Sequence, residues 1–139
     1  MLFQKLKTQK TVNVNISKYL INWEGDCRSK FQKNVKLWLK PYWKHDICLE
    51  ELLIPGSRMT CDLVNLSKKI VLEVSGDQHL DFNPYFHNNC RMQWHAQILR
   101  DANKQTWSEQ NGFTFVEIYP EDLPLSAKFF KDKYDIDLI

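Results

Sequence analysis

The stretch from Met59 to His79 (MTCDLVNLSKKIVLEVSGDQH) limits the possible folds of this chain more than any other. Two runs rich in β-branched and aliphatic residues, 58–64 and 70–75, are typical of strands, and the short polar segment between them is typical of a turn. Such a hairpin places Asp62 of the first strand beside Glu73 of the second strand. We therefore expect an antiparallel pair of strands that holds two carboxylates close together at the edge of a sheet.

Hydrophobic spacing and stop signals predict the elements around this hairpin. A helix is expected over residues 17–39, because apolar residues recur there at helical spacing, and Pro41 is expected to end it. The other expected elements are an arm or edge strand within residues 1–16, a strand within 45–54, a helix at 91–110 that stops before Asn111-Gly112, a strand at 113–118, and a short helix or ordered tail within 120–139.

This order of elements predicts an α/β domain with a mixed β-sheet flanked by helices. The strand at 113–118 follows a helix that itself follows the strand at 70–75, so these two strands should pair in parallel through a right-handed crossover. A chain of 139 residues fits a single domain spanning residues 1–139. Its content of 43% hydrophobic and 13% aromatic residues excludes a chain that is disordered throughout.

The charge is small overall but unevenly distributed. The formal net charge is +2, yet the N-terminal half is basic, and acids gather at residues 50–51 and within 120–139. This distribution fits a face that binds a polyanion, although a solvated helix surface would give the same pattern. The four cysteines form no CxxC pair, the N-terminus lacks a signal-like apolar run, and no apolar stretch is long enough to span a membrane. We expect a reduced, cytoplasmic protein that does not enter a membrane.

Asp62 and Glu73 each lie within an apolar run, in CDLV and IVLEVS. Carboxylates in such surroundings are costly unless they are paired, hydrogen-bonded or bound to a cation, and two that lie close together repel each other. Hard oxygen ligands favour Mg²⁺, whose remaining positions are filled by water and substrate phosphate. The other interpretation is that both carboxylates face solvent, since Glu73 shares one face of an alternating strand with Val71 and Ser75.

Several further residues are candidates for the same site. His79 follows a glycine turn at the end of the second strand, where it could act as a general base. Asp101 continues the apolar face of its helix and could orient His79, while Arg100 and Lys104 could meet phosphate charge. Glu24 precedes a basic helix, a position where acids also occur simply because they stabilise the helix dipole.

The order and spacing of these residues resemble the PD-(D/E)XK nuclease superfamily. More narrowly, they resemble its branch related to very-short-patch-repair endonucleases, which includes phage homing endonucleases with a Glu-Asp-x-His-Asp signature. The resemblance runs from Glu24 to Ile118 and rests on Asp62, ten intervening residues, Glu73-Val74-Ser75-Gly76-Asp77-Gln78-His79, Arg100-Asp101, and Trp107 with Asn111-Gly112-Phe113. It implies a restriction-endonuclease-like fold, metal-dependent hydrolysis of DNA phosphodiester bonds in homing or repair, and a phage-encoded protein in the cytoplasm of a bacterial host.

The resemblance also implies roles for individual residues. The implied catalytic residues are Glu24, Asp62, Glu73, His79 and Asp101. The implied ligands of Mg²⁺, or of Mn²⁺ in its place, are Asp62, Glu73 and the backbone carbonyl of Val74. The expected contacts to DNA phosphates are Lys30, Lys33, Lys36, Arg100 and Lys104.

The chain departs from the superfamily pattern at Ser75, where the wider family has a lysine. This departure leaves the identity of the base open. It also leaves open a nucleic-acid-binding module with the nuclease fold but no turnover, as well as a structural protein whose acids face solvent. A zinc site built from Cys61, His87, Cys90 and His95 is disfavoured by their spacing. A chain this short has little room for a separate DNA-reading domain, so a homo-oligomer is one expected source of specificity.

Overall fold

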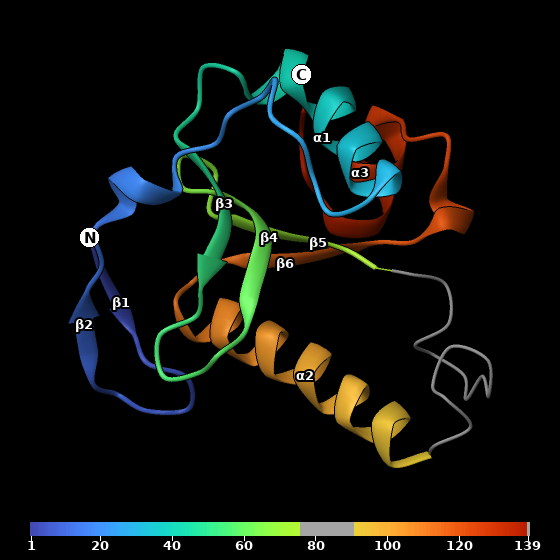
Figure 1. Cartoon of the computed structure of the whole chain (residues 1–139). Coiled ribbons are helices and arrows are strands. Elements are labelled where there is room, and N and C mark those ends of the chain that lie inside the picture. Colours follow the sequence, from blue (N-terminus) through green and yellow to red (C-terminus); the bar gives the residue numbers. More distant parts are fainter. Residues whose placement is uncertain (76–90, 139) are drawn as a thin grey trace.

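Figure 1 shows the computed structural model of the chain, which describes residues 1–75 and 91–138 and, at residues 91–94 and 97, the backbone alone. Its elements follow the order β1 (Leu2–Gln4), β2 (Thr11–Asn13), η1 (Ile16–Tyr19), α1 (Lys30–Trp43), β3 (Cys48–Leu53), β4 (Thr60–Asn65), β5 (Ile70–Val74), α2 (Arg91–Gln110), β6 (Thr114–Ile118), η2 (Pro120–Asp122) and α3 (Ala127–Tyr134). The predicted site residue His79 lies outside the described residues.

Strands β3 to β6 form one four-stranded sheet in sequence order. β4 runs antiparallel to both β3 and β5, whereas β6 runs parallel to β5, with Ile70 opposite Thr114 and Val74 opposite Ile118. A parallel pair needs a long connection, and here the connection includes α2. The predicted mixed sheet and its parallel pair are therefore confirmed, as is the predicted helix at residues 91–110.

Helices cover both faces of this sheet. In Figure 1, α1 and α3 lie on one face, and α2 lies on the other. The core accordingly has two parts, one in which Leu39 and Phe130 pack with Leu72, and one in which Trp107 packs with Val71. Val71 and Leu72 face opposite sides because successive residues of a strand alternate. Among the described residues, no helix combines the length and the apolar character needed to cross a membrane.

The N-terminal residues form a hairpin of their own. β1 and β2 pair antiparallel as a separate two-stranded sheet, which Figure 1 shows beside the C-terminal end of α2. Phe3 is buried, and its ring lies 5.5 Å from the ring of Trp107 on α2. The predicted N-terminal arm is therefore a hairpin fixed to the domain by aromatic packing.

The first helix begins later and ends later than predicted. The helix expected over residues 17–39 is wrong in its bounds, because α1 begins at Lys30 and only a short 3-10 helix, η1, precedes it. Ser29 caps α1, since its Oγ accepts a hydrogen bond from the backbone N–H of Gln32 at 3.1 Å. The prediction that Pro41 ends the helix is also wrong: α1 continues to Trp43, whose buried side chain packs in the core.

Candidate active site

Asp62 and Glu73 lie where the backbones of β4 and β5 cease to pair. The register pairs Leu63 with Leu72, but at the next position side chains replace the backbone ladder. The N–H of Asp62 donates to Oε2 of Glu73 at 2.6 Å, and the N–H of Val74 donates to Oδ2 of Asp62 at 2.9 Å. Each carboxylate therefore bridges the two strands, and the predicted proximity of the two acids is confirmed.

Both acids are buried, with exposed fractions of 8% for Asp62 and 5% for Glu73. The interpretation that they face solvent is therefore wrong. Buried carboxylates need a cation or hydrogen bonds to balance their charge. Lys104 of α2 supplies that charge, since its ammonium forms an ion pair with Oε1 of Glu73 and its side chain is only 18% exposed. Lys104 was predicted to contact phosphate, and in the structure its ammonium contacts Glu73 of the acid pair.

Burial and the charges of the neighbouring groups together shift the pKa values of Asp62, Glu73 and Lys104. Burial raises the pKa of Asp62 above its usual range, although the hydrogen bond from Val74 opposes this shift. Burial, followed by the charge of Asp62, raises the pKa of Glu73 to about 7, while Lys104 opposes this shift. Burial lowers the pKa of Lys104, but the charge of Glu73 and its hydrogen bond more than offset burial, so the pKa of Lys104 is raised overall. One lysine therefore faces two acids, and it balances only one of them when both are ionised.

The acid pair lines a polar cleft of about 350 Å³. The walls of this cleft come from the start of α1, from β4 and β5, and from α2. Residues three or four apart lie on the same side of a helix, which is how α2 brings several side chains to one wall. The predicted site residues that line the cleft are Asp62, Glu73, Val74, Arg100, Asp101 and Lys104. The residues that complete the lining are Arg28, Ser29, Gln32 and Ser75.

Glu51 of β3 is a neighbour of the acid pair that sequence analysis missed. It lies level with Asp62 of β4, between the paired positions Glu50–Leu63 and Leu52–Cys61, although the register does not pair the two residues. Its φ angle is 52°, a left-handed conformation that costs a residue with a Cβ about 1 kcal/mol. Its charge raises the pKa of Asp62, whereas the charge of Arg28 lowers it. The sequence signal for Glu51 was weak, because two consecutive acids such as Glu50-Glu51 are also typical of a solvent-exposed surface.

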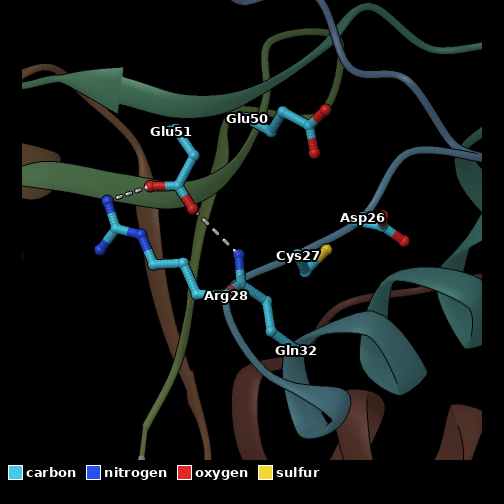
Figure 2. A pocket seen from close by; sticks show the side chains of 6 residues that line it. All are labelled: Asp26, Cys27, Arg28, Gln32, Glu50 and Glu51. Carbon is cyan, nitrogen blue, oxygen red and sulfur yellow. Dashed lines mark hydrogen bonds and ion pairs between the residues drawn. The ribbon is translucent and has the colours of Figure 1, made fainter.

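Figure 2 shows how the neighbours of Glu51 hold its carboxylate. Oε2 of Glu51 forms an ion pair with Arg28 at 2.7 Å, and Oε1 accepts a hydrogen bond from Gln32 at 3.2 Å. Asp26, Cys27 and Glu50 complete the lining of this pocket, which measures about 430 Å³. Arg28 and Gln32 line both this pocket and the acid cleft, so the two hollows share one wall.

Glu24 does not lie in the cleft. It precedes α1, its side chain is 71% exposed, and it forms an ion pair with Lys40. The nearby Lys33 donates to the backbone carbonyl of Glu24 at 3.2 Å and also to that of Gly25. Glu24 and Lys33, predicted as a catalytic acid and a DNA contact, hold the loop before α1 against the helix, and neither lines the cleft.

Lys36 is buried within the domain. Its exposed fraction is 0%, and its ammonium forms an ion pair with Glu50 at 2.9 Å. The prediction that Lys36 contacts DNA is therefore contradicted, because a fully covered ammonium cannot reach a phosphate. The helical pattern alone could not reveal this burial, since the loop that covers α1 was itself predicted to be helix. Lys30 is exposed at the start of α1 but does not line the cleft.

The donors of the cleft suit a hard divalent cation. Mg²⁺ usually takes one or two carboxylates from the protein, together with water and substrate phosphate, and Asp62 and Glu73 supply such a pair. Within residues 1–75 and 91–138, no three or more His, Cys, Asp or Glu side chains form a group that could hold a metal ion. Two of the residues considered for zinc, His87 and Cys90, lie outside the described part of the chain, whereas Cys61 is a buried free thiol.

Comparisons of the chain with protein-family models, with curated proteins and with solved structures found no match. What the cleft does is therefore inferred from its own residues.

Proposed function

We propose that this chain is a Mg²⁺-dependent DNA endonuclease with a restriction-endonuclease-like fold, and that Asp62 and Glu73 form its metal site. The observation that supports this most directly is the buried acid pair with a single lysine beside it, at the wall of an open polar cleft. The order of α1, three antiparallel strands, α2 and a parallel strand supports the proposed fold.

The negative charge of the acid pair favours the binding of a cation. When Asp62 and Glu73 are both ionised, Lys104 offsets only one of their charges, and burial makes the remaining charge costly. A divalent cation held by the two carboxylates would remove this cost. When bound, the ion supplies positive charge that stabilises the negative charge developing on a phosphate during hydrolysis.

In our proposal, Lys104 provides the positively charged amine of this site. Ser75, which stands where the wider superfamily has a lysine, also lines the cleft but carries no charge. Because the raised pKa of Lys104 keeps its amine protonated at neutral pH, Lys104 would stabilise negative charge and orient a phosphate or a water rather than accept a proton. His79 remains a candidate general base, or a residue that orients the attacking water.

The remaining cleft residues fit a polyanionic substrate. Arg28 and Arg100 line the cleft, and guanidinium groups bind phosphate oxygens with two parallel hydrogen bonds. Asp101 lines the cleft from α2, as Arg100 does, and we propose that it orients His79. Two arginines beside an acid pair match the needs of phosphodiester cleavage, in which flanking charges position the backbone and the acids hold the metal.

The test is a nicking assay on supercoiled plasmid in Mg²⁺, in Mn²⁺ and in EDTA. The wild type should nick or linearise the plasmid only with a metal, and Asp62→Asn should abolish this activity. Asp132→Asn makes the same chemical change at an exposed position of α3 and should leave cleavage intact. Cleavage that survives Asp62→Asn would refute the proposed site. DNA binding without cleavage by the wild type would instead favour the binding module that lacks turnover.

A further inference from the structure

The tip of the N-terminal hairpin carries a cluster of exposed positive charge. We define the hairpin tip as residues 5–10, KLKTQK, which join β1 to β2. Lys5, Lys7 and Lys10 are all exposed. No carboxylate in the described part of the chain forms an ion pair with any of them. These lysines therefore differ from Lys33, Lys36 and Lys40 of α1, whose ammonium groups contact carbonyl or carboxylate oxygens of the same domain.

One side chain of α2 forms three hydrogen bonds with the backbone of the hairpin tip. The amide nitrogen of Gln110 donates to the carbonyl oxygen of Lys5 at 2.9 Å and also to that of Thr8, while its oxygen accepts a hydrogen bond from the N–H of Lys7 at 3.0 Å. Lys7 adopts a φ angle of 58°, which is unfavourable for a residue with a Cβ by about 1 kcal/mol. The lysines therefore project from a backbone that is fixed in advance.

Further contacts tie the base of the hairpin to the same helix. The backbone N–H of Gln4 donates to Oδ1 of Asn111 at 2.8 Å, and the indole N–H of Trp107 donates to the carbonyl oxygen of Gln4 at 2.8 Å. The opposite side of the tip meets the turn between β3 and β4, because the N–H of Leu6 donates to the carbonyl oxygen of Pro55 at 2.9 Å. The hairpin tip is thus joined to two elements, α2 and the β3–β4 turn, that both continue to the cleft.

The spacing along α2 relates the hairpin tip to the acid pair. Lys104, which contacts Glu73, and Gln110, which holds the tip, are six residues apart in α2. At 1.5 Å per residue this separation is about 9 Å along the helix axis. Successive phosphates of one DNA strand advance about 3.4 Å along the duplex axis, so a duplex lying along α2 would meet the tip within a few base pairs of the level of the cleft.

We propose that the hairpin tip is a second DNA contact, which grips the phosphate backbone of the duplex a few base pairs from the scissile bond. This inference rests on the proposed nuclease function and adds a positioning surface to it. Lys5, Lys7 and Lys10 supply the charge, and Gln110 supplies the order, so that little conformational entropy of the backbone is lost on binding. The contact is to phosphates and carries no preference for sequence.

The test measures binding of a 20-base-pair fluorescent duplex by anisotropy, in EDTA, over a series of KCl concentrations. Replacement of Lys5, Lys7 and Lys10 by Gln should lower the slope of log K against log salt by about 2 to 3, since each phosphate contact contributes about 0.9. Affinity at low salt should fall at least about tenfold. The control replaces Lys44, Lys69 and Lys128 by Gln, the same change of charge at three exposed positions elsewhere, and should keep the wild-type slope.

A second variant tests whether the ordered backbone of the hairpin tip contributes to DNA binding. Gln110→Ala keeps every lysine but releases the tip, so we expect the salt slope to stay near that of the wild type while affinity falls severalfold. Wild-type affinity in this variant would overturn the claim that the tip is ordered in advance for DNA. An unchanged salt slope in the triple Lys→Gln variant would overturn the contact itself.

The outcomes separate this inference from the proposed activity. A wild type that binds duplex DNA with a tip-dependent salt slope but never cleaves it would support the contact and refute the nuclease. A wild type that cleaves DNA with a slope independent of the tip would do the reverse. No measurable binding of duplex DNA at low salt would overturn both.

Discussion

Two clusters of charge in this domain have similar compositions but opposite character. In the first, which we call the loop clamp, Glu24 and Glu50 pair with Lys40 and Lys36 around the segment before α1. Every acid there has its own lysine. In the second, the acid pair of Asp62 and Glu73 shares Lys104 beside an open cleft. The balance of charge, together with access to a cleft, therefore separates a candidate active site from a structural cluster in this domain.

The strain of the backbone follows the same division. Glu51, level with Asp62, takes a left-handed conformation, and the ladder between β4 and β5 gives way to side-chain hydrogen bonds at Asp62 and Glu73. Beside the loop clamp, Lys33 and Lys36 instead stabilise the loop by donating hydrogen bonds to the carbonyl oxygens of Glu24 and Gly25, respectively. Irregular backbone that re-aims side chains toward a cleft is typical of functional sites.

The largest expected effect is on cleavage. Glu73→Gln should lower the rate of DNA cleavage about a thousandfold, because it removes a charged oxygen ligand from the proposed metal site. Glu24→Gln, which changes an acid of the loop clamp, should stay within about twofold of the wild type. Initial nicking rates in Mg²⁺ measure both. If the two variants lose activity equally, the division between the clusters is wrong and Glu24 acts in catalysis after all.

The next effect is on stability. Lys36→Met should lower the free energy of unfolding by about 3 kcal/mol, since it leaves the partly buried Glu50 without its partner. Lys104→Met should also lower the free energy of unfolding, because it leaves the buried Glu73 without its partner, and it should in addition lower the cleavage rate by about a hundredfold in the protein that remains folded. Urea denaturation and nicking rates, measured on both variants, distinguish these outcomes. A folded Lys104→Met protein with full activity would make Lys104 a structural residue.

A smaller effect is the pH dependence of stability. The pKa of Glu73 is about 7 in the folded protein and near 4.5 when the chain is unfolded, so between these values the folded state binds more protons than the unfolded state. Metal-free wild type should therefore lose stability as the pH rises through this window, by up to about 3 kcal/mol from this group. The difference in unfolding free energy between Glu73→Gln and wild type should shift in favour of the variant from pH 5 to pH 8. A difference that is flat with pH would contradict the raised pKa.

The sequence predicted the elements whose signals are local. The β-branched and aliphatic runs of β4, β5 and β6 placed these strands to within two residues, the stop at Asn111-Gly112 placed the end of α2, and the hairpin placed Asp62 beside Glu73. The start of α1 was missed because apolar residues recur at helical spacing on the N-terminal side of Ser29 as well. The helix begins only after Ser29, which caps it.

The parts of the site that the sequence did not predict depend on contacts between layers. Lys104 reaches Glu73 from a helix on one face of the sheet, and nothing in the helical pattern distinguishes it from a solvated lysine. The pairing of Arg28 with Glu51 depends on the loop that precedes α1 and on a left-handed residue within a strand. Such contacts are set by tertiary packing rather than by propensity.

The central claim is that the unbalanced acid pair binds a divalent cation. Isothermal titration of the metal-free protein with Mn²⁺ and with Mg²⁺ at pH 7.5 tests it most directly, with Asp62→Asn and Glu24→Gln titrated alongside. We predict binding to the wild type and to Glu24→Gln, its loss in Asp62→Asn, and a stabilisation of about 1.4 kcal/mol when the metal is at ten times its Kd. Undiminished binding to Asp62→Asn, or no binding to the wild type at millimolar metal, would contradict the claim.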